Sequence, residues 1–131
     1  MHRIDHAIKV TLAGGPVLGL ADKLDVDSYF FGDYTVPQAT PVNQAVEVLI
    51  PDLSSANVEA VFLLVSSPQT TAELAFDDPN GAGVSRPVRG PILMVGAETV
   101  AQLGLTDKLY FTNPDPVFPA MVRVLIGINN V

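Results

Sequence analysis

Short apolar runs that stop at glycine, proline or asparagine recur along this chain. In its second half the runs 90–96, 109–114 and 121–127 follow this pattern and are rich in β-branched and aromatic residues. Such runs are typical of the strands of an all-β sandwich or barrel. The most continuously apolar run, 58–65, is expected to be a central strand that is buried on both faces. Eight strands are expected in all, over residues 6–12, 28–36, 44–50, 58–65, 71–76, 87–95, 108–112 and 120–128.

These strands predict a single antiparallel β-sandwich, jelly-roll-like, with one short helix. A length of 131 residues fits one domain that is large enough for a hydrophobic core. The helix is expected over residues 97–103, where Val100 and Leu103 are three residues apart. Glu98 lies in the first turn of this helix, and Gly104 suits a C-terminal cap.

Residues 1–12 are expected to be either the first strand of this fold or an N-terminal arm, with the sandwich domain over residues 13–131. The Gly-Gly-Pro run at 14–16 is interpreted as a hinge, followed by an irregular link over residues 17–24. Apolar residues of the arm need burial. The sheet edge of a neighbouring subunit would provide it as readily as the chain's own sheet.

The composition indicates a partner protein. Charged residues make up 16% of the chain and hydrophobic residues 48%, against about 25% charged residues in ordinary soluble domains. Too few charges on an apolar chain indicate that another protein covers part of the surface. A homo-oligomer is therefore expected, with a trimer favoured. The alternative is a monomer whose surface is rich in Thr, Ser and Gln.

The charge balance argues against nucleic acid as a partner. The net charge is −7, and the few basic residues are scattered, with Arg86 and Arg89 as their one close pair. Nucleic-acid binding needs clustered basic residues that displace counterions from phosphates. The apolar runs are too short to span a bilayer, so no membrane partner is expected. The absence of cysteine suits assembly in a reducing cytoplasm.

Two histidines near the N-terminus are the first candidates for a metal site. His2 and His6 have the four-residue spacing that binds zinc from one face of a helix. Their segment has a strand-like pattern, however, and residues four apart in a strand are about 13 Å apart. Because no third ligand is evident, no metal is expected here.

Acidic residues form two further candidate sites. Asp22, Asp25 and Asp27 could bind a hard cation or act as a glycosidase pair, and Asp77 and Asp78 could bind calcium. The closing glutamate of a calcium loop is absent, and the Asp-Pro and Asn-Gly steps after Asp77 are turn chemistry. Solvated turns are the favoured interpretation of both clusters.

No catalytic residues are expected. The chain has only two histidines, lacks a Gly-x-Ser-x-Gly elbow and a cysteine nucleophile, and has no glycine-rich loop with the spacing of a phosphate cradle. An enzyme is therefore not expected, and neither is a cofactor.

An aromatic cluster over residues 29–34 is the one feature that could bind a sugar by stacking. In a strand, Tyr29 and Phe31 share one face and Phe30 lies on the other. Half of the cluster is expected in the core, and the rest could anchor a subunit interface. Gly32 indicates a bulge or a close backbone approach. The residues expected at the interface are Ile4, Ile8, Val10, Tyr29, Phe31, Tyr34 and Phe118.

The order of features from about residue 58 to residue 127 resembles the small β-sandwich structural proteins of tailed-bacteriophage virions, of the kind that cement or decorate the capsid. The stretches that carry the resemblance are Ser66-Ser67, Gly90-Pro91-Ile92-Leu93, Leu103-Gly104-Leu105, Leu109-Tyr110-Phe111-Thr112-Asn113-Pro114 and Ile126-Gly127. The resemblance implies a non-enzymatic, commonly trimeric subunit present in many copies. Such a subunit contacts the major capsid protein or other virion subunits on the outer capsid surface, after assembly in the host cytoplasm.

Three other functions stay open. The first is a receptor- or glycan-binding β-sandwich, which exposed and coplanar aromatic residues at 29–34 would favour. The second is a tail-tube, adaptor or stopper protein of the same particle, which would show ring symmetry. The third and most distant is a small hydrolase.

Overall fold

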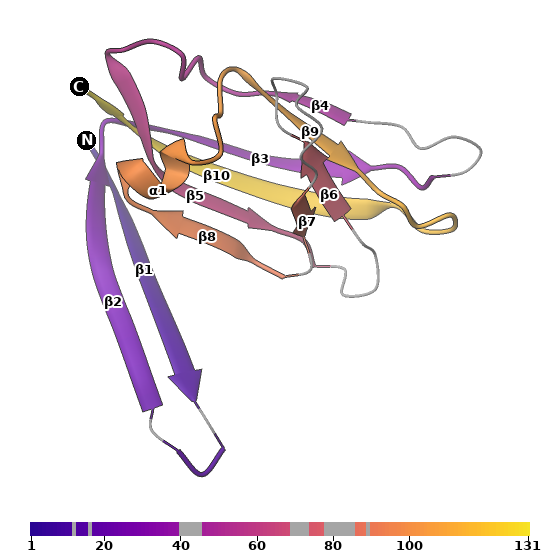
Figure 1. Cartoon of the computed structure of the whole chain (residues 1–131), viewed down its shortest axis with the longest axis horizontal. Coiled ribbons are helices and arrows are strands. Elements are labelled where there is room, and N and C mark those ends of the chain that lie inside the picture. Colours follow the sequence, from indigo (N-terminus) through magenta and orange to yellow (C-terminus); the bar gives the residue numbers. More distant parts are fainter. Residues whose placement is uncertain (12, 16, 40–45, 69–73, 78–85, 89) are drawn as a thin grey trace.

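The computed structural model describes residues 1–11, 13–15, 17–39, 46–68, 74–77, 86–88 and 90–131. Within these ranges the chain forms ten strands and one short helix (Figure 1). The elements are β1 (His2–Thr11), β2 (Val17–Val26), β3 (Ser28–Val36), β4 (Val46–Leu49), β5 (Val58–Ser66), β6 (Leu74–Asp77), β7 (Arg86–Val88), β8 (Ile92–Val95), α1 (Ala97–Ala101), β9 (Lys108–Thr112) and β10 (Ala120–Asn130).

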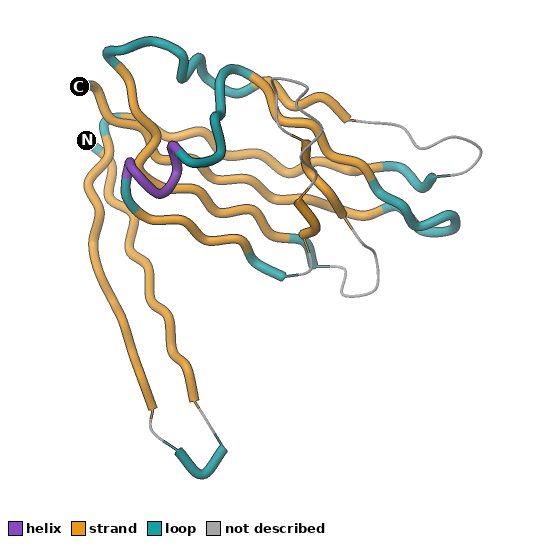
Figure 2. The backbone as a smooth tube through the Cα atoms, in the orientation of Figure 1, coloured by secondary structure: helices purple, strands orange, loops and turns teal. Residues whose placement is uncertain are grey.

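The N-terminal part of the chain is a long hairpin. Strands β1 and β2 pair antiparallel over their full ten residues, from His2 opposite Val26 to Thr11 opposite Val17. The irregular link expected over residues 17–24 is therefore wrong. The hinge expected at 14–16 is wrong as well, because this run connects two strands that pair with each other. Gly14 lies in the turn between them, and its φ of 72° is the left-handed backbone that such turns use. The hairpin projects away from the rest of the chain (Figures 1 and 2).

The other eight strands form two four-stranded sheets. The first sheet has the order β3-β10-β5-β8, and the second has the order β4-β9-β6-β7. All of the pairings are antiparallel. Four of the pairings are nested along the sequence: β3 with β10, β4 with β9, β5 with β8 and β6 with β7. Two further pairings, β10 with β5 and β9 with β6, join these four pairs into the two sheets. This is the strand order of a jelly roll, so the predicted all-β, jelly-roll-like fold is confirmed.

The eight strands of this sandwich are not the eight that the sequence pattern predicts. Residues 87–95 form two strands instead of one, because Gly90 and Pro91 separate β7 from β8, and Pro91 has no N–H for a sheet ladder. The two halves then pair in different sheets. Residues 6–12 belong to the hairpin and not to the sandwich. The sandwich therefore has eight strands, as predicted, but they are not formed by the same eight segments.

The two sheets share one hydrophobic core. Strand β10 alternates buried and exposed residues from Ala120 to Val124, as a strand with one inward face does. Its buried side chains belong to the same cluster as buried side chains from the second sheet. Residues of this core include Val36, Leu63, Val65, Val122, Val124 and Ile126 from the first sheet and Val48, Val88, Leu109 and Phe111 from the second. Burial of each large side chain stabilises the fold by about 1.5–3 kcal/mol.

The short helix contributes to the core as well. Val100 and Leu103 are buried and belong to the core cluster, as their spacing predicts. The α-helix ends at Ala101, and the chain continues with tighter bonds from Leu103 N–H to the Val100 carbonyl (3.1 Å) and from Gly104 N–H to the Ala101 carbonyl (3.1 Å). Gly104 has a φ of 64°, which confirms the predicted glycine cap.

Gly32 permits a close approach within β3. A Cβ on Gly32 would lie 2.5 Å from the hydroxyl oxygen of Tyr34, because the Tyr34 ring lies over the glycine. The register between β3 and β10 continues without a shift through Gly32, so of the two predicted alternatives the bulge is wrong and the close approach is confirmed. A register shift occurs instead between β10 and β5, at Gly127 and Ile128.

Candidate interaction surface

The outer face of the first sheet carries two rows of mostly apolar residues that run across its four strands. Antiparallel partners share a face of a sheet, so the register assigns each row. One row is Tyr29, Gly127, Phe62 and Val95, and it is named the covered row because the hairpin contacts its first three members. The open row is Phe31, Leu125, Leu64 and Leu93.

The base of the hairpin lies on the covered row. The His2 ring meets the Tyr29 ring edge to face, with centroids 4.9 Å apart. Four residues further along β1, the His6 ring is tilted against Phe62 with centroids 5.8 Å apart. Phe62 is only 2% exposed, although it lies on the outer face of the sheet. Successive residues of one face of β1 therefore contact successive strands, and the hairpin crosses the sheet.

Gly127 makes this crossing possible. A Cβ on Gly127 would lie 2.9 Å from Ile4 Cδ1, 2.9 Å from Val26 Cγ1 and 3.1 Å from Phe62 Cβ. Both hairpin strands therefore press against the bare backbone of β10. A glycine at this position lets the hairpin approach the sheet more closely than any side chain would allow.

The open row has no such cover. The Phe31 side chain is 54% exposed, and Leu125, Leu64 and Leu93 are half-buried. The Arg123 guanidinium lies 6.0 Å from the Phe31 ring centroid, and its Nε is 2.8 Å from Asp33 Oδ1. Hydrogen bonding to Asp33 and its negative charge raise the pKa of Arg123.

A groove of about 390 Å³ separates the hairpin from the open row. Its walls are His2, Arg3, Ile4, Asp5, Tyr29 and Leu125. The floor is therefore partly aromatic and apolar, and one wall is the charged edge of β1. The groove can accept either an apolar chain segment or a polar ligand that stacks on Tyr29.

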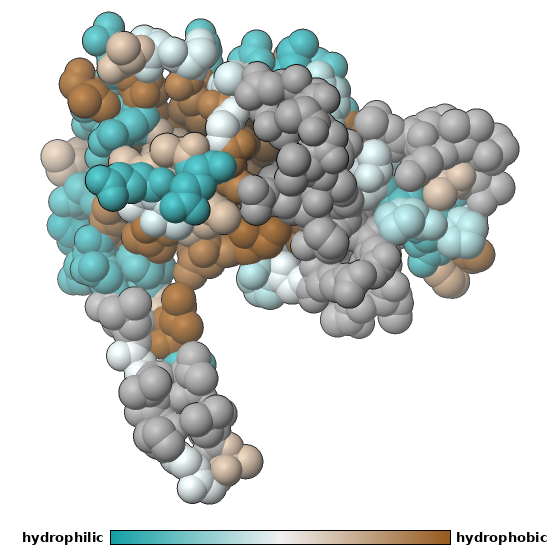
Figure 3. Space-filling view, viewed as in Figure 1, coloured by the Kyte–Doolittle hydropathy of each residue, from teal (hydrophilic) through white to brown (hydrophobic). Residues whose placement is uncertain are grey.

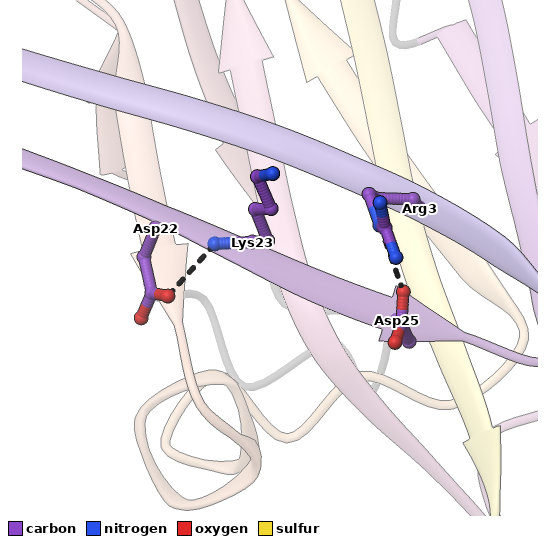
Figure 4. Close-up of polar contacts among 4 residues, drawn as sticks. All are labelled: Arg3, Asp22, Lys23 and Asp25. Carbon is purple, nitrogen blue, oxygen red and sulfur yellow. Dashed lines mark hydrogen bonds and ion pairs between the residues drawn. The ribbon is translucent and has the colours of Figure 1, made fainter.

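The hairpin itself has one apolar and one polar face. Its register places Ile4, Ile8, Leu24 and Val26 on one face, together with His2, His6 and Asp22. On the opposite face Arg3 Nε lies 3.3 Å from Asp25 Oδ1, across the two strands (Figure 4). Asp22, which pairs with His6 in the register, accepts a hydrogen bond through Oδ1 from the Lys23 backbone N–H at 2.7 Å. Ile8 is 41% exposed, and Figure 3 shows hydrophobic atoms on the hairpin where it leaves the sandwich.

One residue, Asp27, joins the hairpin to the sandwich. Its N–H donates to the Ile128 carbonyl and to Asn129 Oδ1, both at 3.0 Å. Its Oδ2 accepts from the Asn130 N–H at 2.8 Å. The carboxylate of Asp27 therefore binds the backbone of β10, and the carboxylate of Asp25 pairs with Arg3. Across the described ranges, no group of three or more potential ligands gathers to hold a metal ion.

Only part of the predicted acidic turn at residues 77 and 78 lies within the described residues. Asp77 is the last residue of β6, and Asp78 lies outside the described residues. His2 and His6, the other metal candidates, contact aromatic rings of the first sheet. His6 Nδ1 is enclosed there and has no hydrogen-bond partner within the described chain.

A second exposed apolar site lies in the loop between β9 and β10. Buried Asn113 donates through Nδ2 to the Phe118 carbonyl (2.8 Å) and accepts from the Asp115 N–H (3.0 Å). Asp115 Oδ1 accepts from the N–H groups of Phe118 and Val117, and these bonds lower the pKa of Asp115. The loop is therefore an ordered support for Val117 and Phe118, which are 62% and 63% exposed.

The predicted interface residues are divided among several places. Tyr29 and Phe31 lie on the outer face of the first sheet, beside Ile4 at the base of the hairpin. Ile8 lies further along the hairpin, and Val10 pairs with Leu18 in the register, its side chain being outside the described part. Tyr34 packs against the core instead, and burial raises its pKa. Phe118 belongs to the loop between β9 and β10, which lies at the end of the sandwich away from the hairpin (Figure 1).

Sequence reasoning missed the open row and the second hairpin strand. Leu64 belongs to the run expected to be buried on both faces, yet it is half-exposed on the outer face. The signal for β2 was present, since Leu18, Leu20, Leu24 and Val26 alternate with mostly polar or small residues. The interruption by Asp22 obscures this period of two.

Only the fold and this surface bear on the function of the chain. No known family model, curated protein or solved structure matches the chain. The described part of the chain contains no helix that is long and apolar enough to cross a membrane. The chain is thus an eight-stranded jelly roll that carries a projecting N-terminal hairpin and an exposed apolar row.

Proposed function

We propose that the protein is a non-enzymatic structural subunit of a virion, of the kind that cements or decorates a tailed-phage capsid. Its partners are other copies of itself and the major capsid protein or another virion subunit. Its place is on the outer capsid surface. The jelly roll agrees with this role, because the fold recurs in viral capsid proteins, although it also occurs in lectins and cupins.

The observation that carries the proposal is the projecting hairpin with one apolar face. An isolated two-stranded hairpin is marginally stable in water. Beyond its base, this hairpin leaves the sandwich with Ile8 41% exposed. The open row and the Phe118 loop add two further exposed apolar sites. A chain with several such sites is suited to contacts with several neighbours, and weak contacts repeated by symmetry stabilise a shell.

The charge distribution agrees with an outer position. A net charge of −7 would be repelled by packaged DNA inside a shell but is tolerated on its outside. The Asp33–Arg123 pair on the outer face leaves no excess charge beside Phe31. The outer face of the first sheet is therefore suited to protein contact.

Particle analysis tests this proposal. Phage particles from the strain that encodes the chain would be purified on a density gradient and examined by quantitative mass spectrometry and electron cryomicroscopy. We expect a fixed copy number and density for a jelly roll on the capsid. Density in a ring at the tail would identify an adaptor or stopper instead, and absence from purified particles would reject a virion role.

The groove beside Tyr29 supports a second candidate function, a glycan-binding jelly roll. Tyr29 is 53% exposed, and the groove also presents Arg3, Asp5 and His2, whose polar groups could bind sugar hydroxyls. An aromatic ring with flanking polar groups is a common way to bind a small polar ligand. The edge-on contact of His2 with Tyr29 occupies part of the ring, which is why this function is placed second.

A glycan array separates the two functions. If the protein binds glycans, Tyr29→Ala and Asp5→Asn should each abolish the signal, and Tyr110→Ala, a change of the same residue type in the second sheet, should leave it unchanged. No signal from the parent chain at micromolar concentration would exclude the glycan function. It would leave the virion proposal intact.

A further inference from the structure

The hairpin and the open row of the first sheet are two apolar surfaces of one molecule that do not meet each other within it. Along β1, His2 contacts Tyr29 of β3, Ile4 contacts Gly127 of β10, and His6 contacts Phe62 of β5. Strand β8 is the edge strand that follows β5. Beyond this crossing the hairpin projects away from the sandwich (Figure 1), and Ile8, two residues after His6, is 41% exposed.

The base of the hairpin shows what its apolar face can pack against. That face already contacts three strands of this sheet, β3, β10 and β5, on the covered row. The open row lies two residues away on each strand and runs in the same direction, with Leu125 where the covered row has Gly127. Between the two rows lies the groove that His2, Ile4 and Leu125 help to line. A second hairpin crossing the open row would place the same apolar face on the same sheet, packed against leucine side chains instead of bare backbone.

The distribution of charge favours a contact between the hairpin of one copy and the sandwich of a second copy over a contact between two sandwiches. The hairpin, residues 2–26, contains three basic residues and three acidic residues, so its formal charge is zero and the net charge of −7 lies on the rest of the chain. Two sandwiches that meet face to face would repel each other, whereas a neutral hairpin meets a negative sandwich without that cost. The charged residues of the hairpin are Arg3, Lys9, Lys23, Asp5, Asp22 and Asp25.

We infer that the part of the hairpin around Ile8 of one copy docks on the open row of a second copy. The apolar face around Ile8 covers Phe31, Leu125, Leu64 and Leu93 of the neighbour. The contact is head-to-tail, because the hairpin and the open row are different surfaces. This inference deepens the proposed assembly role by naming the partner and both contacting surfaces.

Two charge substitutions test the contact from its two sides. Ile8→Glu alters the hairpin, and Phe31→Glu alters the open row. Both residues are largely exposed, at 41% and 54%, so circular dichroism and melting should show an intact fold. Light scattering coupled to gel filtration should report an oligomer for the parent chain and a monomer for each variant. Lys9→Gln, one residue further on the polar face, changes the charge of the hairpin by the same amount as Ile8→Glu, so it is the matched control and should leave the oligomer intact.

Mixing the two variants gives the sharpest result. The Ile8→Glu chain keeps an intact open row, and the Phe31→Glu chain keeps an intact hairpin. A head-to-tail contact therefore predicts that an equimolar mixture forms a one-to-one dimer, although each variant alone is a monomer. A mixture that stays monomeric overturns the inference. A monomeric parent at micromolar concentration, or variants that stay oligomeric, overturns it as well.

Cross-linking locates the contact independently, since the chain has no native cysteine. Chains carrying Ile8→Cys would be mixed with chains carrying Phe31→Cys and treated with a short bifunctional maleimide. We expect a cross-linked heterodimer at a yield at least tenfold above that of Lys9→Cys mixed with Phe31→Cys. Equal yields would reject the docking. A positive result for a protein that is absent from particles would reject the virion role and leave the hairpin contact standing.

Discussion

The hairpin and the sandwich are built on the same alternation of apolar and polar residues, but they differ in where their apolar faces go. In the sandwich, the inward residues of β10 meet those of the second sheet in one closed core. In the hairpin, the face that carries Ile4 packs on the sheet at the hairpin base, and Ile8, further along the same face, is 41% exposed. Alternation in a strand thus defines a face, while the topology decides whether the chain itself covers that face.

The two regions differ in how they are held as well. Every strand of the sandwich has neighbours in a sheet and a partner sheet across the core. The hairpin is held by its own ladder, by the contacts of its base and by the Asp27 joint. We therefore expect amide hydrogen exchange to be slow in β10 and β5 and much faster toward the tip of the hairpin in the isolated protein.

The largest expected effect is the loss of folding stability when a buried phenylalanine is replaced, compared with the same replacement of an exposed one. Phe111 is fully buried in the core, and Phe31 is 54% exposed on the open row. Phe111→Ala should lower the free energy of unfolding by about 3–5 kcal/mol, because it leaves a cavity. Phe31→Ala should lower it by less than about 1 kcal/mol. Chemical denaturation of both variants below the concentration of assembly gives the comparison, and equal losses would show that the open row is part of the folding core.

A truncation that begins at Asp27 tests whether the sandwich is independent of the hairpin. All eight jelly-roll strands and the Asp27 joint remain, so a cooperatively folded domain is expected. Its stability should fall by about 2 kcal/mol, because Phe62 loses its cover. Thermal melts followed by circular dichroism measure this loss. A truncated chain with no cooperative transition would make the hairpin an integral part of the fold.

Gly127→Ala should separate the hairpin from the sheet without deleting it. The new methyl group would meet Ile4 and Val26 at 2.9 Å, closer than such atoms pack. We expect a loss of about 1–3 kcal/mol and faster exchange of the amides near the hairpin base. Gly19→Ala is the control within the hairpin, because a Cβ there meets nothing within 4 Å. Similar exchange in both variants would mean that the sheet is not what holds the hairpin.

The smallest expected effect concerns acid and the Phe118 loop. The folded-state pKa of Asp115 is lowered by the N–H groups of Phe118 and Val117, so this carboxylate stabilises the loop above its unfolded pKa. The contribution is lost as the pH falls through the folded pKa. The amide signals of Val117 and Phe118 should therefore change below about pH 4 in the parent chain. Asp115→Asn should remove that change, and an unaltered titration would contradict the assignment.

The fold class was predictable because it depends on local signals. The strand-like runs at residues 28–36 and 120–128, the Gly104 cap and the Val100–Leu103 pair all have local physical causes, and all appear in the structure. The division of residues 87–95 between two sheets was not predictable from apolarity, since Ile92 and Val88 differ in their partners and not in their character.

The candidate surface was predictable only in part. Exposure of Tyr29 and Phe31 follows from the alternation in β3. The open row, in contrast, exists only once β3, β10, β5 and β8 are placed in register, and those strands are distant in sequence. The role of Gly127 is equally non-local, because it depends on where Ile4 and Val26 cross β10.

The one-residue joint at Asp27 has a consequence for the size of any assembly. The hairpin cannot swing freely, because three hydrogen bonds tie Asp27 to Ile128, Asn129 and Asn130 at the end of β10. A head-to-tail contact closes into a ring only when the rotation between neighbours divides a full turn, and otherwise it forms an open helix. The angle at which Asp27 directs the hairpin would then set the number of copies in a ring.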